Sequence, residues 1–241
     1  MCTLLQQVGC VLPDQHTSTD SDYLQAVIDA LCELSSTDPL SGLLNRRAFQ
    51  LVLERELDRV ARSGEQALLL AVDIDHFKSF NDRYGHLAGD MVIRSVAQAL
   101  QQSVRPMDAV ARMGGEEFCV VCPNCLPTYA PVVAERIRAM VEETRITVSD
   151  TLPPLNVTVS CGGAFATPWI RGHSLEWLER ADAHLYKAKH LGRNRISLES
   201  VSMPEVTAEE KGLLLSWNAM DPHMIKDEFP FDPTGVRIIP E

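Results

Sequence analysis

Hydrophobic and polar positions in the middle of the chain follow two different periods. Residues 67–74 form a nearly continuous apolar run of strand length, which predicts a strand buried on both faces. Residues 45–62 place apolar side chains three and four positions apart and stop before Gly64, which predicts a helix. The same periods predict further helices over 89–104, 128–143 and 174–190 and further strands over 155–166 and 195–198.

A hairpin is predicted near the centre of the chain. Two short apolar runs, 109–112 and 117–122, flank Gly114 and Gly115, and a tight turn between strands favours glycine because it needs positive φ. The resulting order is strand–helix–strand, then strand–helix–strand. It favours an α/β (α+β) fold, a ferredoxin-like or palm-type sandwich whose central, mostly antiparallel sheet is flanked by helices.

Charge divides the 241 residues into three segments. The whole chain has 33 acidic and 22 basic residues, a net charge of −11. Residues 1–37 hold five acidic residues and no Lys or Arg, and residues 200–241 hold eight acidic and three basic ones. Residues 38–199 are therefore nearly neutral and are predicted to form the main folded domain. The flanks are expected to be extensions, each with a short helix, over 22–34 and near 207–217.

Composition excludes several classes of protein. The acidity argues against a nucleic-acid-binding surface, which needs clustered Lys and Arg. No apolar run is long enough to span a membrane, so membrane insertion is not expected, and the first residues lack the basic region of a signal peptide. Seven cysteines, an odd number in scattered apolar contexts, indicate a reduced, cytoplasmic chain.

The hairpin carries the first candidate chemistry. Glu116 and Glu117 directly follow the two glycines, whose lack of side chains lets a ligand approach the backbone. Carboxylates there can bind a hard cation. Successive strand residues point to opposite faces, so the two glutamates are expected to have different roles. The alternative is a solvated hairpin tip without a function.

The strand over residues 67–74 ends in a second acidic group. Asp73 lies at the end of the strand, where ligand sites form in α/β sheets, and could meet Glu117 across neighbouring strands to hold a divalent ion. Lys78, about one helical turn further on, could meet a phosphate bound to that ion. The alternative reading is local: Asp75 would only cap the helix that follows.

Asn81 and Asp90 supply an amide and a carboxylate, which can read the donor and acceptor pattern of a purine edge. By itself, this segment is better explained as an ordinary loop with caps.

Five motifs together resemble the GGDEF family of diguanylate cyclases across roughly residues 38–198. They are DPLSGLLNRRAF at 38–49, DIDHFKSFND at 73–82, YGHLAGD at 84–90, RMGGEEF at 112–118 and ADAHLYKAKHLGRNR at 181–195. A departure is Ser41, where the family commonly has Thr; the hydroxyl is retained.

The resemblance implies roles for individual residues. Glu116 matches the acidic position needed for turnover. The metal ligands would be the Asp73 and Glu117 carboxylates and the Ile74 carbonyl. The GTP-binding residues would be Phe77, Lys78, Asn81, Asp90, Gly114, Gly115, Lys189 and Arg193. Arg105 and Asp108 match the family's RxxD site, at which cyclic di-GMP inhibits; a helix-end salt bridge is the alternative reading.

The implied activity is that of a nucleotidyltransferase. Two GTP molecules would give cyclic di-GMP and two pyrophosphates, with two Mg²⁺ or Mn²⁺ ions per site and a homodimer that brings two sites together. A protein partner acting through the extensions is a further expectation. The alternative function is a catalytically silent receptor or scaffold for GTP or cyclic di-GMP. Degenerate members of the family lose the glutamates or the metal aspartate, and this chain keeps them, which favours the enzyme.

Overall fold

The computed structural model describes residues 36–148, 153–167 and 173–200. A six-stranded sheet is the centre of this part of the chain, with the strand order β1-β3-β4-β2-β5-β6. The strands are β1 (Leu44–Asn45), β2 (Ala67–Ile74), β3 (Ala109–Gly114), β4 (Glu117–Pro123), β5 (Val159–Ala166) and β6 (Ile196–Leu198). The three central pairings are antiparallel and the two edge pairings are parallel, which confirms the mostly antiparallel sheet.

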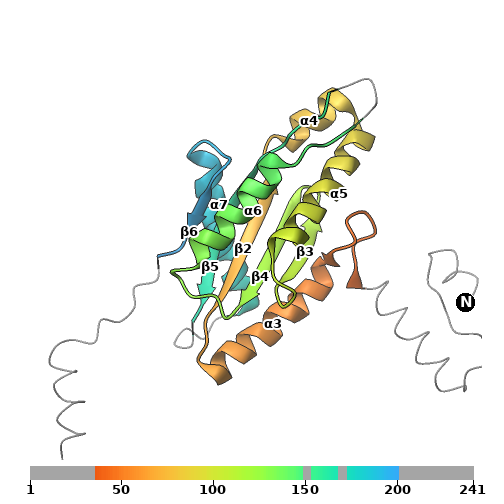
Figure 1. The fold of residues 1–241 in the computed structure, drawn as a ribbon. Coiled ribbons are helices and arrows are strands. Elements are labelled where there is room, and N and C mark those ends of the chain that lie inside the picture. Colours follow the sequence, from red (N-terminus) through yellow and green to blue (C-terminus); the bar gives the residue numbers. More distant parts are fainter. Residues whose placement is uncertain (1–35, 149–152, 168–172, 201–241) are drawn as a thin grey trace, which may run out of the picture. The chain divides into compact units, whose positions relative to one another are not determined.

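Helices cover both faces of the sheet. They are α3 (Arg46–Ser63), α4 (Phe77–Tyr84), α5 (His86–Ser103), α6 (Ala130–Glu143) and α7 (Ser174–His190). Figure 1 shows α5 and α6 side by side across one face. α3 and α7 pack on the other face, so the described residues form a three-layer α+β sandwich.

β2 belongs to both cores because it is buried along its whole length. Leu68 and Leu70 point into the cluster shared with α5 and α6, while Leu69 and Ala71 point into the cluster shared with α3 and α7. This alternation is the geometry of any strand. It explains why the sequence shows a continuous apolar run rather than an alternating one.

The ends of α3 follow local rules. The Asn45 side chain accepts a hydrogen bond from the Ala48 N–H, and Gly64 ends the helix in the left-handed conformation with φ of 75°. The predicted bounds of β2 and α7, 67–74 and 174–190, agree with the structure at both ends.

Four predicted boundaries were wrong by two to four residues. α5 begins at His86 rather than 89, α6 begins at Ala130 rather than 128, and β3 ends at Gly114 rather than 112. β5 begins at Val159 rather than 155, because Leu155 forms only an isolated bridge with Ile146 before the chain joins the sheet.

The two local readings of residues 75–90 were also wrong. The segment from 81 to 90 is not a loop, because α4 and α5 occupy nearly all of it. Asp75 does not cap α4: the cap position is His76, in the left-handed conformation with φ of 58° and without a side-chain cap bond. The Asp75 carboxylate instead bonds to β5 and to the segment after α7.

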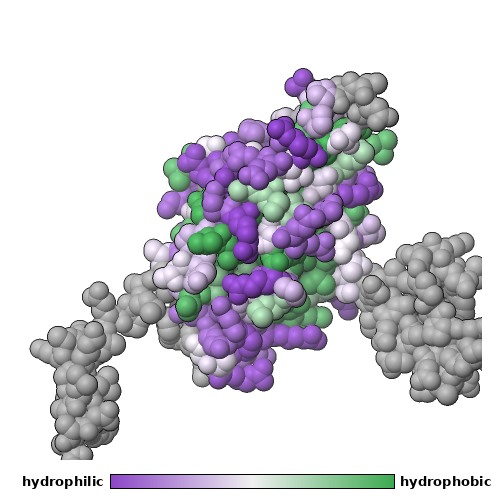
Figure 2. Space-filling model, in the orientation of Figure 1, coloured by the Kyte–Doolittle hydropathy of each residue, from purple (hydrophilic) through white to green (hydrophobic). Residues whose placement is uncertain are grey.

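The predicted helices over 22–34 and near 207–217 lie outside the described residues. Among the described helices, none combines the length and the apolar character needed to cross a bilayer. Figure 2 shows hydrophilic residues over most of the visible face, with smaller hydrophobic patches between them.

Candidate active site

Two acidic side chains meet at one end of the sheet. Asp73 of β2 and Glu117 of β4 are directly opposed in the antiparallel register. Directly opposed residues project from the same face, which here is the face covered by α3 and α7. The pairing expected from the strand order is therefore present. Asp73 is 6 % exposed, whereas Glu117 is open to solvent.

Lys189 reaches this pair from the last turn of α7. Its Nζ lies 2.7 Å from Oδ2 of Asp73. Burial raises the pKa of the Asp73 carboxyl above its usual range; the hydrogen bond and charge of Lys189 oppose that rise, while Glu116 and Glu117 add to it. Both glutamates of the hairpin therefore lie within electrostatic reach of Asp73. The carboxylates can bind a metal cation, and the facing lysine can bind an anion next to that cation.

The hairpin is braced by a residue pair to which the sequence analysis gave no role. Arg112 donates to the Gly115 carbonyl through Nε at 3.0 Å and Nη2 at 2.9 Å, and its Nη1 lies 3.1 Å from Oδ1 of Asp38. Partial burial raises the pKa of the Asp38 carboxyl, but hydrogen bonds from Ser41 and Arg112 outweigh it and lower the pKa overall. Gly115 has φ of 53°, a left-handed conformation that glycine adopts without steric cost in a tight turn. Asp38 and Arg112 both lie in motifs quoted above, and this was the feature of the sequence that could have identified them.

α4 and α5 bring the expected purine-reading residues together. A Cβ on Gly89 would overlap the side chain of Asn81 and lie 3.2 Å from the Phe77 ring, so these three residues are in close contact. Asp90 follows Gly89 in α5. Oδ1 of Asn81 is buried and has no hydrogen-bond partner within the part of the chain that the structure describes. This oxygen faces Gly89 of α5, so the Asn81 side chain would have to turn before the oxygen could meet a ligand donor.

The expected phosphate-binding cations come from two helices and the segment after α7. Lys189 and Arg193 line one surface hollow with Tyr186 and His190, whose rings are 4.1 Å apart. Arg193 is exposed and has φ of 62°, an uncommon conformation for a residue with a side chain. Lys78 is exposed on the first turn of α4.

Arg105 and Asp108 form a tight turn at the other end of β3 from the hairpin. The Asp108 carboxylate accepts from the Arg105 backbone N–H at 2.8 Å, and the Asp108 N–H donates to the Arg105 carbonyl at 2.9 Å. The bond runs to the backbone, so the predicted alternative of a salt bridge is wrong. Oδ1 of Asp108 is buried without a partner among the described residues. β3 separates the turn from the hairpin by about 17 Å.

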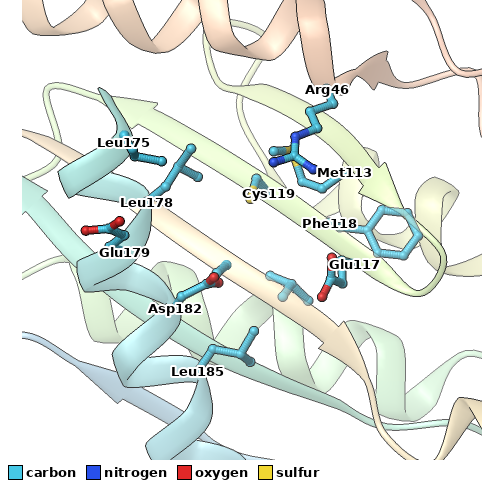
Figure 3. A pocket seen from close by; sticks show the side chains of 12 residues that line it. Arg46, Met113, Glu117, Phe118, Cys119, Leu175, Leu178, Glu179, Asp182 and Leu185 are labelled. Atoms are coloured by element: carbon cyan, nitrogen blue, oxygen red, sulfur yellow. The ribbon is translucent and has the colours of Figure 1, made fainter. Parts of the chain in front are cut away.

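A hollow lies behind Glu117, between α3, α7 and the sheet (Figure 3). Its floor is apolar, and its charged residues are Arg46, Glu117, Glu179 and Asp182. Three carboxylates against one guanidinium repel a polyanion, so a triphosphate does not belong in this hollow. Cys119 also lines it, but burial raises the pKa of this thiol and keeps it protonated.

A family model and the sequences of known proteins match the same part of this chain. The family model described as "Diguanylate cyclase, GGDEF domain" matches residues 35–195. The response regulator PleD of Caulobacter vibrioides is 40 % identical over 176 residues, which are 73 % of this chain and 38 % of PleD. Diguanylate cyclase VdcA of Vibrio cholerae is 42 % identical over 160 residues, 66 % of this chain and 45 % of VdcA. The chain thus spans less than half the length of these relatives.

Solved structures of similar proteins have a similar fold. The coiled coil and GGDEF domain of DgcB from Caulobacter crescentus, in complex with c-di-GMP, has a TM-score of 0.70 and 34 % identity over 75 % of this chain and 94 % of that one. Diguanylate cyclase SiaD from Pseudomonas aeruginosa, in complex with its activator SiaC, has a TM-score of 0.67 and 35 % identity over 73 % of this chain and 66 % of that one.

Proposed function

The chain belongs to the GGDEF family of diguanylate cyclases, and on that basis we propose that it condenses two GTP molecules into cyclic di-GMP and two pyrophosphates. The observation that carries the proposal is the meeting of Asp73, Glu117 and Lys189 at one end of the sheet. It provides oxygen ligands for a cation and a positive charge for the phosphate bound to that cation. Asn81, on the helix that follows β2, adds an amide that can pair with a purine edge.

The donor set fits a hard divalent ion. The described residues contain no preformed group of three or more His, Cys, Asp or Glu ligands for a metal. Mg²⁺ commonly takes only one or two protein carboxylates and completes its shell with substrate phosphates and water. Asp73, Glu117 and the Ile74 carbonyl would hold Mg²⁺ or Mn²⁺, two ions per site. When bound, these ions neutralise charge on the triphosphate and favour attack at phosphorus.

Each step of the proposed reaction uses residues of this chain. Glu116 accepts the proton of the 3′-hydroxyl of one GTP, whose oxygen forms a bond to the α-phosphorus of the other GTP. The bond between that phosphorus and the bridging oxygen to the β-phosphorus breaks, and pyrophosphate leaves. Lys78, Lys189 and Arg193 hold the triphosphate, and the hairpin backbone at Gly114 and Gly115 lies against it.

Guanine recognition is assigned to the contact between α4 and α5. Phe77 packs beside the base, the Asn81 carbonyl accepts from it, and the Asp90 carboxylate accepts from N1–H and the 2-amino group of guanine. Adenine would place its N1 acceptor against that carboxylate and leave both groups unpaired, so the site discriminates against ATP. Each chain would hold one GTP. Turnover therefore requires two chains facing each other as a homodimer.

The activity is tested by incubating the purified chain with GTP and Mg²⁺ and separating the products by chromatography. We expect cyclic di-GMP and two pyrophosphates for each product molecule. The Glu116→Ala variant should form product at least a hundredfold more slowly, because the 3′-hydroxyl loses its proton acceptor. Binding of GTP without any cyclic di-GMP would instead establish the silent receptor.

The turn at Arg105 and Asp108 is proposed as the inhibitory product site. The exposed Arg105 guanidinium offers donors to guanine or phosphate, and the Asp108 carboxylate, held in the turn by the Arg105 backbone N–H, would supply the acceptor for guanine. Its distance from the hairpin means that inhibition would act on the active site from outside it.

Replacement of Asp108 by Ala should raise the concentration of cyclic di-GMP that halves the initial rate by about tenfold or more, since a charge-assisted hydrogen bond to guanine is lost. The measurement is the initial rate at fixed GTP with increasing added cyclic di-GMP. Uninhibited rates should stay within about twofold, because the turn does not contact the reacting atoms. An unchanged inhibition curve for the variant would remove this turn from the proposal.

A further inference from the structure

A second aspartate at the end of β2 has a distinct set of partners. Asp75 is 6 % exposed, and its carboxylate accepts three hydrogen bonds. Ser160 Oγ donates to Oδ1 at 2.6 Å, Thr158 Oγ1 donates to Oδ2 at 2.7 Å, and the Asn194 backbone N–H donates to Oδ2 at 2.9 Å. The three donors come from β5 and from the segment after α7, far along the chain. The three hydrogen bonds to this buried carboxylate fix the end of β2 to β5 and to the segment after α7, which is a different role from a helix cap.

The segment bound to Asp75 has an unusual backbone. Gly192, Arg193 and Asn194 all have positive φ, at 117°, 62° and 45°. Two of these residues carry side chains, for which this conformation is unfavourable and persists only where surrounding contacts impose it. The Asn194 N–H bond to Asp75 is one such contact.

Further contacts fix the same turn from α6 and α7. The Asn194 side chain donates to Glu142 at 2.7 Å and accepts from Arg138 at 2.7 Å. The Arg193 N–H donates to the Ala188 carbonyl at 3.2 Å, which joins the turn to the last turn of α7. The turn that carries Arg193 is therefore held on one side by Asp75 and on the other by two helices.

The end of β2 connects the proposed metal-binding part of the candidate site to its phosphate-binding part. Asp73 pairs with Lys189, and Asp75, two residues later, holds the turn that presents Arg193. Lys189 and Arg193 line the same surface hollow. Thus one strand end positions the proposed metal ligand Asp73 and two of the three cations assigned to the triphosphate, Lys189 and Arg193.

We propose that Asp75 is a positioning residue for phosphate recognition, which rests on the proposed function of the site. It acts through the Asn194 N–H, holds the turn at 192–194 in its left-handed conformation, and so aims Arg193 at the triphosphate. It does not contact the nucleotide. Its loss should therefore weaken binding of the phosphates and leave recognition of guanine intact.

The first test compares two ligands on the full chain. 3′-Deoxy-GTP carries the triphosphate but lacks the attacking hydroxyl, and guanosine carries only the base and sugar. In Asp75→Ala we expect the Kd for 3′-deoxy-GTP to rise about tenfold or more and the Kd for guanosine to stay within about twofold. Equal loss of both ligands would indicate a general structural role, and unchanged 3′-deoxy-GTP binding would also overturn the proposal.

Glu199→Ala is the matched control. Glu199 also accepts a backbone N–H, from Phe165 at 3.0 Å, and ties β5 to α7 through Arg180 at 2.7 Å. Neither of these contacts involves the turn at 192–194. This variant should leave the 3′-deoxy-GTP affinity within about twofold. An effect equal to that of Asp75→Ala would contradict a specific role for Asp75.

A second test needs no nucleotide and so separates this proposal from the proposed activity. Hydrogen exchange of the Asn194 amide should accelerate at least tenfold in Asp75→Ala, while amides of β2 keep their protection. Asp75→Asn keeps an oxygen acceptor, so its exchange should lie between those of the wild type and Asp75→Ala, which provides a test even if the alanine variant does not fold. Unchanged Asn194 exchange in both variants would overturn the inference, whatever the chain does with GTP.

Discussion

Replacement of Asp73 by Asn should lower the rate of cyclic di-GMP formation at least a thousandfold at saturating Mg²⁺. The carboxylate is 6 % exposed, is opposed to Glu117 and is paired with Lys189, so its charge bears on both the proposed cation and the phosphate-binding lysine. The amide is similar in size, so the effect reports charge rather than shape. A thousandfold loss corresponds to about 4 kcal/mol of transition-state stabilisation. The measurement is the initial rate of pyrophosphate release from GTP.

Asp58→Asn is the matched control, because it removes a carboxylate from an exposed position late in α3. It should keep the wild-type rate within about twofold. If Asp73→Asn retained more than a tenth of the wild-type rate while folded, the two hairpin glutamates would have to bind the cation without β2. The proposed ligand set would then be wrong.

Replacement of Gly162 by Ala should lower the free energy of unfolding by about 3 kcal/mol or more. A Cβ at this position of β5 would overlap the backbone of α7 at the Leu185 nitrogen and the Ala181 carbonyl. Backbone atoms of a packed helix cannot rotate away, so α7 would have to move off the sheet, and Lys189 with it. The measurement is urea unfolding followed by circular dichroism, and the corresponding fall in Tm is about 6–12 °C.

Gly163→Ala gives the comparison on the other face of the same strand. Its Cβ would meet the ends of the Leu198 and Leu70 side chains, at 2.5 Å and 2.8 Å, which can change rotamer. We expect a smaller cost of about 1 kcal/mol. Equal stability of Gly162→Ala and the wild type would mean that α7 does not depend on this close approach.

Elements with strong local patterns were predictable from the sequence. β2 has the bounds expected from its apolar run. α3, expected over 45–62 and closed by Gly64, spans Arg46–Ser63 with Asn45 and Gly64 as its caps. α4 was anticipated only as a helix after Asp75, without bounds, because within it only Phe77 is buried and its cap residue His76 has a left-handed conformation that no sequence pattern indicates. The tertiary environment, rather than periodicity, makes this segment helical.

The candidate site was likewise predictable only in part. The sequence placed Asp73 and Glu117 at strand ends that could meet if the two strands were neighbours, and the antiparallel pairing of β2 with β4 makes them neighbours. The wrong reading of Asp75 shows the limit of local reasoning: its partner Asn194 lies 119 positions away in the sequence. A capping rule considers only the next few residues, so it missed a carboxylate with distant partners.

The shortness of the two outermost strands bears on how copies of the chain can associate. β1 has two residues and β6 has three, and Thr37 forms a bridge to Leu44 of β1. Strands this short offer few backbone groups for a neighbouring chain to continue the sheet. Association through helices and loops is then favoured over a shared sheet, and such contacts separate more readily. We therefore expect the proposed homodimer to be reversible, so that its population, and with it the synthesis of product, rises with protein concentration.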